Sequence, residues 1–358
     1  MATWDPDSDC LPKLNELPKI PGAPEHAAWF WGPNDEVKSR AFTFIMQLSE
    51  SFSSHRNPVR PQRSEIPCTN DLAPQLGRLN LLTPRRVTEA AKLIQTGERA
   101  GLNLPAEWPE PPFFGRQAFK HTVVKVRPHA FDDLYELNTQ SGSQWDGFRH
   151  TTVKQIEDKS GKIGTSAWAH RGIVGRGVLI DFYDHCGKSY DPFTPRKITA
   201  NEIKACAKAQ GVEFHYGDIF IVRTGFSDAY RKLDERQREK LGTKAYLDLQ
   251  FAGLSRAHET VELLHDNYFS AVASDAPAFE TWPMDEPEHL HHWLLPLWGC
   301  PIGELWDLEE LAALCKKHQR YTFFLSSSPA NVKGKSSRVI ARLSPGVVRR
   351  NIVANDGT

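Results

Sequence analysis

The stretch Asn138-Thr-Gln-Ser-Gly-Ser-Gln-Trp-Asp-Gly-Phe-Arg-His150 gathers chemically versatile side chains at even spacing. Side chains two or four residues apart share one face of an extended strand. Gln140, Gln144 and Asp146 are therefore predicted to converge on one side of a strand, with His150 following across a turn. A polar edge strand that ends in a solvated histidine has the same pattern, and spacing alone does not separate the two.

The composition is that of a globular protein with balanced charge. The chain has 358 residues, of which 44 are basic and 44 acidic, so no face for nucleic acid or anionic membrane is predicted. No apolar run approaches the roughly 20 residues of a membrane span. The six cysteines include no C-x-x-C pair, which argues against a zinc ribbon and for reduced thiols. With no targeting signal recognised, we expect a cytoplasmic protein with a small-molecule substrate.

Helix and strand signals alternate through the chain and predict an α/β fold. Residues 1–74 are predicted to form an N-terminal arm packed on the body, with a helix over 37–52. Residues 75–330 are predicted to form one catalytic domain, and 331–358 a basic C-terminal tail. The expected helices begin after Thr83, Thr199, Ser255 and Asp307, and the expected strands cover 121–126, 178–182, 218–223, 269–273 and 321–325.

Glycines in the stretch Gly172-Ile-Val-Gly-Arg-Gly177 invite comparison with a dinucleotide-binding loop. Such a loop follows a strand and opens a helix, whereas these glycines precede the apolar residues 178–182. We therefore interpret them as turn glycines. The heavily charged residues 227–250 are predicted to form either a solvated helix or an excursion on the surface.

Further candidate site residues lie in the last third of the chain. Asp275 follows the apolar stretch 269–273, which is a frequent active-site position in α/β folds and equally a frequent turn position. Glu304 lies between apolar residues, where a carboxylate is costly unless it meets a partner or a cation. His291 and His292 share an apolar neighbourhood, and either is a candidate site histidine.

Taken in this order, the motifs resemble the cyclase family of hydrolases, which includes bacterial kynurenine formamidase and isatin hydrolase. The chain is most similar to the longer members from fungi and bacteria. The resemblance implies a single domain with a mixed sheet of the swivelling β/β/α type, usually a homodimer with its site near the subunit interface. The landmarks are Leu79-Asn-Leu-Leu-Thr-Pro84, 140–150, 172–181, 217–225, 274–280 and 299–308.

The family signature is H-x-G-T-H-x-D-x-P-x-H, whose first two histidines and aspartate bind a divalent metal. In this chain Gln140 and Gln144 replace the two histidines, and Phe148 replaces the proline. Asp146 and His150 match the signature. The ligand chemistry at this position therefore differs from that of the family.

The resemblance implies a changed metal site. Its ligands would be Gln140, Gln144, Asp146 and Glu304, and His291 is favoured over His292 as the accompanying histidine because an apolar pair follows it. Amide oxygen is a harder and weaker ligand than imidazole. Such a set favours Mn²⁺, Mg²⁺ or Ca²⁺, leaves Zn²⁺ a weaker candidate, and is compatible with no ion at all.

The leading prediction is metal-assisted hydrolysis of a cyclic amide, N-acyl or lactone bond in a small aromatic molecule, with His150 as general base and then acid. One alternative is a metal-independent cyclase, dehydratase or isomerase of secondary metabolism that uses the Gln/Asp/His cluster. The other is a binding protein that has lost catalysis. Besides His150, the predicted catalytic residues are Asp146, Asp275, His291 and His292, and the predicted substrate contacts are Trp145, Phe148 and Arg149.

Overall fold

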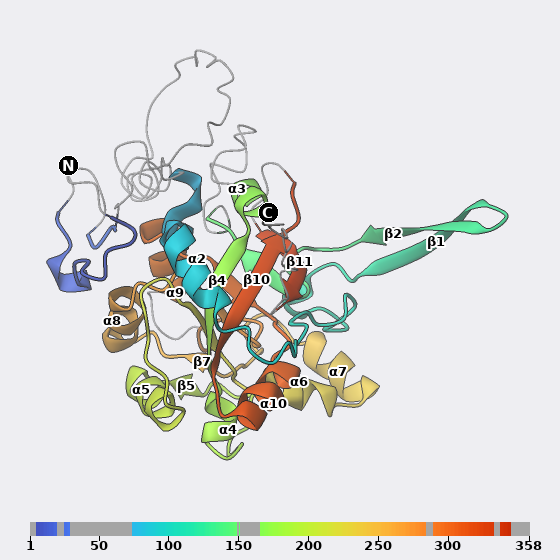
Figure 1. The fold of residues 1–358 in the computed structure, drawn as a ribbon. Helices are drawn as coiled ribbons and strands as arrows, with labels where there is room; N and C mark the ends of the chain where they lie inside the picture. Colours follow the sequence, from blue (N-terminus) through green and yellow to red (C-terminus); the bar gives the residue numbers. More distant parts are fainter. Residues whose placement is uncertain are drawn as a thin grey trace, which may run out of the picture.

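The structure is a computed structural model that describes residues 5–19, 25–28, 74–148, 150, 165–283, 289–332 and 337–344. The helix predicted over 37–52 lies outside the described residues, as does Arg149. The described part is mixed α/β, as the sequence predicts, with one curled mixed sheet at its centre (Figure 1).

Seven strands of the described residues close into a barrel in the order β10-β11-β3-β9-β8-β6-β4. The neighbours β4, β6, β8 and β9 run parallel, and the remaining contacts are antiparallel. The sheet is therefore mixed. The barrel strands are β3 (Gln144–Asp146), β4 (Ile173–Ile180), β6 (Ile219–Val222), β8 (Ala271–Ser274), β9 (Ile302–Glu304), β10 (Thr322–Pro329) and β11 (Ser337–Ser344).

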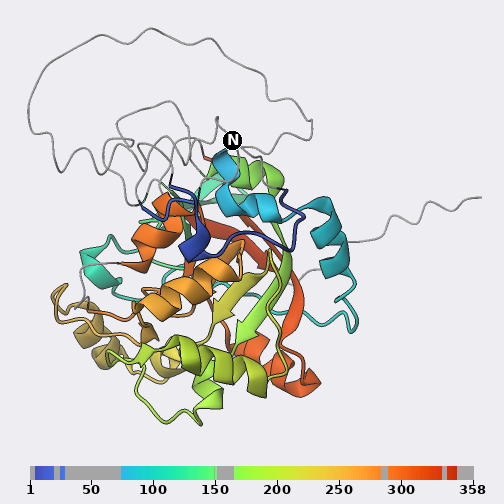
Figure 2. The ribbon, with the colours of Figure 1, turned by 90° about the vertical axis from the view of Figure 1, so that its left-hand side faces the viewer.

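Helices connect the parallel strands and lie on the outside of the barrel (Figure 2). Helix α5 (Ala200–Ala209) packs against both β4 and α8 (His258–Asp266), and α2 (Pro84–Ala91) packs against β4 and β10. The other helices are α3 (Ser166–Arg171), α4 (Phe182–His185), α6 (Phe226–Arg231), α7 (Glu235–Gly242), α9 (Leu290–His292), α10 (Glu309–His318), the short turns η1 (Leu14–Glu16), η2 (Pro74–Leu81) and η3 (Phe113–Gly115), and the π-helical turn η5 (Trp293–Leu297).

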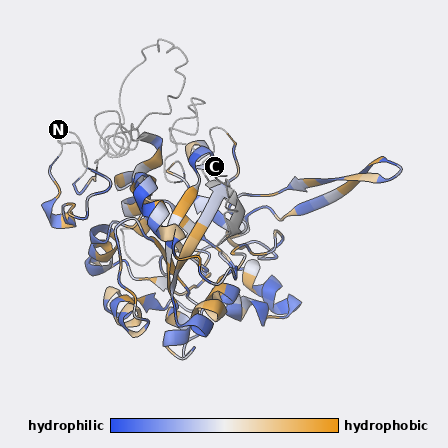
Figure 3. Cartoon of the chain, viewed as in Figure 1, coloured by the Kyte–Doolittle hydropathy of each residue, from blue (hydrophilic) through white to orange (hydrophobic). Residues whose placement is uncertain are grey.

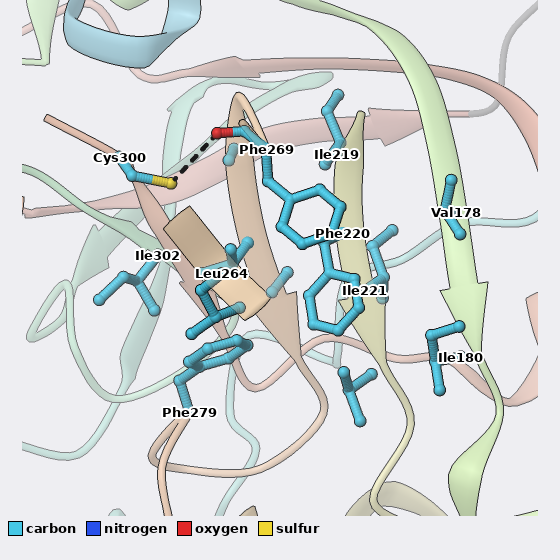
Figure 4. Close-up of a cluster of buried hydrophobic side chains, with 14 of the residues drawn as sticks. Val178, Ile180, Ile219, Phe220, Ile221, Leu264, Phe269, Phe279, Cys300 and Ile302 are labelled. Atoms are coloured by element: carbon cyan, nitrogen blue, oxygen red, sulfur yellow. Dashed lines mark hydrogen bonds between the residues drawn. The ribbon is translucent and has the colours of Figure 1, made fainter. Parts of the chain in front are cut away.

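The core lies between the parallel strands and their helices. Strands β6 and β8 are buried along their whole length, which explains why their sequences are continuous apolar runs rather than alternating ones. Phe220 stacks on Phe269 with ring centroids 4.6 Å apart (Figure 4). The hydropathy of the ribbon follows the same division, with apolar β4 inside and hydrophilic α7 outside (Figure 3).

Two glycines that we interpreted as turn residues lie inside strand β4, and that interpretation is wrong. A Cβ on Gly177 would lie 2.4 Å from Phe323 Cε2, and one on Gly175 would lie 2.7 Å from Leu82 Cδ2. The glycines therefore allow side chains of the next strand and of the segment before α2 to pack directly on the backbone of β4. Periodicity could not show this because the packing partners are remote in sequence.

Two of the four predicted helix caps are confirmed. The hydroxyls of Thr83 and Thr199 accept hydrogen bonds from backbone amides at the starts of α2 and α5. The other two are wrong, because helices α8 and α10 have Ala257 and Leu308 as their N-caps. The carboxylate of Asp307 accepts a hydrogen bond from the Glu309 backbone amide at 3.4 Å and also forms an ion pair with Arg231.

Segments of the predicted N-terminal arm pack on the body. Leu14 is buried, and its backbone amide donates to Asp266 Oδ1 at 2.8 Å. Arg86 of α2 pairs with Asp9 at 2.9 Å. The predicted C-terminal tail differs from expectation, because β11 lies between β10 and β3 and completes the barrel beyond the predicted boundary at 330.

Two smaller sheets lie outside the barrel. Strands β5 (Lys197–Ile198) and β7 (Gly253–Leu254) form a short parallel pair. Strands β1 (Lys120–Arg127) and β2 (Ala130–Glu136) form an antiparallel hairpin that projects from the body (Figure 1). The predicted strand over 121–126 is thus confirmed. No helix among the described residues has the length and apolar character needed to traverse a bilayer.

A buried ion-pair network lies at the C-terminal ends of the parallel strands β4 and β6. Arg223 lies 2.8 Å from Asp181 and 2.6 Å from Glu309, and the Arg223 and Asp181 side chains are each only 4% exposed. A buried charge that loses its partner is strongly destabilising.

We expect Arg223→Met to lower the free energy of unfolding by about 3–5 kcal/mol, because it leaves the Asp181 carboxylate buried without a cation. The matched control is Arg231→Met, at a pair whose arginine is 39% exposed, for which we expect about 1 kcal/mol or less. Urea titration monitored by tryptophan fluorescence measures both. Equal effects of the two substitutions would contradict the assigned role.

Candidate functional site

The site is built on the antiparallel contact between β3 and β9. Gln144 pairs directly with Glu304 in the register of these strands, and directly opposed residues of an antiparallel pair share a face. Asp146 lies two residues beyond Gln144 and projects to the same side. All three side chains are buried. Gln144 and Asp146 therefore lie on one face as predicted, and β9 adds the Glu304 carboxylate to that face.

Two amide groups link the carboxylates of this face. The Gln140 side-chain amide donates to Asp146 Oδ1. The Gln144 Nε2 donates to Gln140 Oε1 at 2.5 Å and to Glu304 Oε2 at 2.9 Å. The side chains that replace the two signature histidines thus act here as hydrogen-bond donors to carboxylates.

Helix α9 supplies the site histidine. His291 Nε2 lies 3.3 Å from Glu304 Oε1 and 3.5 Å from Asp146 Oδ2, and its Nδ1 lies 2.8 Å from Glu280 Oε2. Of the two histidines left open by the sequence, His291 is the one that enters the cluster. Sequence reasoning missed Glu280 as a site residue, although the signal that marked Glu304, a carboxylate among apolar neighbours, applies to it as well.

Burial and close charges shift the pKa values of these groups in opposite directions. Burial disfavours ionised Asp146, but the imidazoles of His150 and His291 and the hydrogen bond from Gln140 lower its pKa to about 2. Burial and the charge of Asp146 raise the pKa of Glu304. Burial opposes protonation of His291, yet the surrounding carboxylates raise its pKa well above the ordinary value of 6.5. Opposite charges within a few ångströms account for the lowered pKa of Asp146 and the raised pKa of His291, whereas burial and a like charge account for the raised pKa of Glu304.

A pocket of about 280 Å³ opens beside the cluster. His150 faces it, with its ring centroid 6.2 Å from that of His291 and its Nδ1 3.5 Å from Gln140 Nε2. Glu304 and His291 reach the pocket from the cluster. Lining residues that the sequence did not indicate include Phe114, Arg116, Tyr246 and Trp282, which come from segments without a motif.

The donor set fits a divalent cation. Ligand atoms of Asp146, His291 and Glu304 all lie within 4.8 Å of one another. Buried Asp146 Oδ2 and Gln144 Oε1 have no hydrogen-bond partner among the residues that the structure describes. With Glu280, three buried carboxylates surround one imidazole, and so much negative charge out of water is costly without a further cation. The grouping replaces the predicted set in part, because His291 joins it and the Gln140 amide is committed to hydrogen bonds.

Several predicted site residues lie elsewhere. Trp145 points away from the cluster into the core, where its Nε1 donates to Ser327 Oγ at 2.9 Å. Phe148 is buried against Trp168 with ring centroids 5.1 Å apart. Neither lines the pocket, so the substrate contacts predicted for them are corrected. The odd position of Trp145 in an extended strand already places it on the opposite face from Asp146.

Asp275 is likewise a structural residue in this arrangement. Its carboxylate accepts hydrogen bonds from the backbone amide of Thr224 at 2.6 Å, the Thr224 hydroxyl at 2.8 Å and the Ser227 amide at 3.3 Å. It does not line the pocket. The carboxylate therefore anchors the segment between β6 and α6, a role that neither the catalytic nor the turn interpretation included. His292 lines the pocket but is not part of the Asp146–His291–Glu304 grouping.

We expect the His291 imidazole of the metal-free protein to remain protonated well above pH 6.5, because Glu280, Asp146 and Glu304 favour its cationic form. Glu280→Gln should lower this pKa. The His291 contribution to stability is then complete below pH 6.5 and is lost as the pH rises through the folded-state pKa. Nitrogen-15 NMR titration of protein freed of metal by a chelator measures the His291 pKa. An ordinary or lowered pKa would refute the claim that the three carboxylates favour the cationic imidazole.

Comparisons with known proteins agree with the fold. A crystal structure described as that of a novel cyclase is 28% identical, with a TM-score of 0.66 over 75% of this chain and 95% of that chain. An isatin hydrolase bound to the product analogue thioisatinate is 17% identical, with a TM-score of 0.53 over 73% and 98% of the two chains. Isatin hydrolase A from Ralstonia solanacearum gives the same identity and TM-score over 73% and 97%.

Sequence comparison gives the family. No curated protein matches the chain. The model of the Cyclase family matches residues 67–281, which include β3 with the Gln140–His150 stretch and the strands up to Glu280. This match spans more than half of the chain, and the chain therefore belongs to the Cyclase family.

Proposed function

We propose that the protein is a metal-assisted hydrolase that cleaves a cyclic amide, N-acyl or lactone bond in a small aromatic molecule. The observation that carries the proposal is the grouping of Asp146, His291 and Glu304 beside a pocket that His291, Glu304 and His150 line. Membership in the Cyclase family supports an enzyme of the hydrolase or cyclase kind. The fold similarity to isatin hydrolases is consistent with cyclic-amide chemistry.

Asp146, His291 and Glu304 would hold the cation, and the Gln144 Oε1 is a further candidate donor. Three oxygen donors and one imidazole favour Mn²⁺ or Mg²⁺ over Zn²⁺. A divalent cation at such a site polarises a carbonyl and lowers the pKa of a water molecule. Glu280 Oε2, 2.8 Å from His291 Nδ1, fixes the tautomer and the ring orientation in which Nε2 faces Asp146 and Glu304.

His150 is the proposed proton-transfer residue. Its imidazole lines the pocket and lies close to the Gln140 amide without entering the carboxylate cluster. It is therefore free to take a proton from the attacking water and to pass it to the leaving nitrogen or oxygen. The Gln140 amide holds Asp146 in place and orients the His150 ring.

A second candidate function is metal-independent proton transfer in a cyclisation, dehydration or isomerisation. The observation in its favour is that both glutamine amides donate to carboxylates. Neutral donors already compensate part of the negative charge that a metal ion would otherwise balance. Asp146 and His150 could then move a proton without an ion.

The first test is elemental analysis of the purified protein before and after loading with Mn²⁺, Mg²⁺ and Zn²⁺. We expect one ion per chain, with Mn²⁺ retained best. The Asp146→Asn variant should lose that ion, because the substitution removes the charge of the ligand while keeping the size of the side chain nearly unchanged. The matched control is Asp275→Asn, a buried aspartate outside the grouping, which should keep the ion. No bound ion under any loading would favour the second candidate.

The second test concerns His150. We expect His150→Gln to lower kcat by at least about 100-fold on hydrolysed substrates, because a general base contributes roughly 10²–10⁴-fold. Metal content should be unchanged. Turnover of N-formylaniline, isatin and an aromatic lactone, followed by absorbance, provides the screen, and His292→Gln serves as the control on the same pocket. Undiminished turnover in His150→Gln would remove the proposed role.

A further inference from the structure

Three aromatic rings from remote segments form one wall of the pocket. Phe114 belongs to η3, Tyr246 follows α7, and Trp282 follows β8. The Trp282 ring meets Phe114 at 5.1 Å and Tyr246 at 4.9 Å between centroids, both edge-to-face. Its Nε1 donates to the Tyr246 carbonyl at 3.2 Å. This mutual packing fixes the wall before any ligand binds.

Arg116 lies on the same pocket beside this wall. Its guanidinium lies over the Phe114 ring at 4.9 Å from the centroid, and its Nη1 donates to the Gln140 carbonyl at 2.6 Å. A guanidinium has five N–H donors, and the bond to the Gln140 carbonyl is the one side-chain hydrogen bond that Arg116 makes within the described residues. No carboxylate of the described chain forms an ion pair with it.

Contacts of Arg116 also fix its orientation. Stacking on Phe114 and the hydrogen bond to the Gln140 carbonyl hold the Arg116 guanidinium at the pocket wall, next to the start of the Gln140–His150 stretch. A stacked, planar guanidinium with spare donors is suited to a carboxylate, which it binds through two parallel hydrogen bonds. Burial lowers the pKa of Arg116, and an anionic ligand group would restore a favourable environment for its charge.

We infer that the pocket recognises an aromatic carboxylate, with the ring against Phe114, Tyr246 and Trp282 and the carboxylate on Arg116. The volume of about 280 Å³ suits one substituted ring or a fused pair of rings. The identity of the substrate rests on the proposed hydrolase function: the amide or ester that is cleaved would belong to a molecule with an aromatic ring and a carboxylate. As a statement about binding, it does not depend on turnover.

The purely structural alternative is that Arg116 only anchors the turn through the Gln140 carbonyl and offsets the charges of Glu304 and Asp146. These two roles differ in their consequences for ligands. A structural arginine gives no preference between an anionic and a neutral ligand of the same shape. A recognition arginine gives a preference that disappears with the guanidinium.

The test compares benzoate with benzamide, its neutral isostere, by calorimetric titration of the full-length protein. We expect the wild type to bind benzoate at least about tenfold more tightly, as a charged pair of hydrogen bonds implies. Arg116→Gln should abolish this ratio, and Arg116→Lys, which keeps the charge but not the fork, should reduce it. Arg127→Gln on the projecting strand β1 is the matched control and should leave the ratio unchanged.

A carboxylate could also prefer a metal ion, so each titration is repeated after chelation. The inference predicts that the ratio survives chelation. Equal binding of the two ligands, no binding of either, loss of the ratio on chelation, or an unchanged ratio in both Arg116 variants would overturn it. A preserved ratio in a protein that hydrolyses nothing would refute the proposed function and leave the binding assignment standing.

Discussion

The antiparallel contact of β3 with β9 is the constraint on which the site depends. It places Gln144 opposite Glu304 and closes the barrel between the antiparallel strands and the parallel ones. Both strands are three residues long and buried. Because side chains alternate along a strand, a slip of one residue would move Gln144 and Asp146 into the core and bring Trp145 toward the pocket. The packing of Trp145 and Trp306, edge-to-face at 4.8 Å, opposes such a slip.

That register brings buried carboxylates together, and their negative charge is balanced by neighbouring groups. Asp146, Glu304 and Glu280 are buried together around His291. The glutamine amides, the imidazole of His291 and a divalent cation are the available sources of compensation. In the proposed metal site, the two glutamine amides in place of imidazoles would shift the ligand set toward oxygen donors, and His291 would be its nitrogen ligand. The pocket and His150 lie beside this cluster, and the glutamine amides balance part of its negative charge.

The sequence predicts the parts of this arrangement that follow from local rules. Period-two spacing places Gln140, Gln144 and Asp146 together, and the cost of a buried carboxylate marks Glu304. Local rules fail where packing is remote. The glycines of β4 make room for side chains distant in sequence, and β11 closes the barrel from the predicted tail. Arg116 has no motif around it, and only the fold brings it to Gln140.

The proposed hydrolase function requires that Asp146, His291 and Glu304 together hold a divalent cation beside His150. Anomalous X-ray diffraction from crystals grown with Mn²⁺ tests it most directly. We expect a single strong manganese peak within coordination distance, about 2.0–2.6 Å, of oxygen or nitrogen atoms of all three residues. A peak elsewhere, or no peak with the amide-to-carboxylate hydrogen bonds intact, would contradict it.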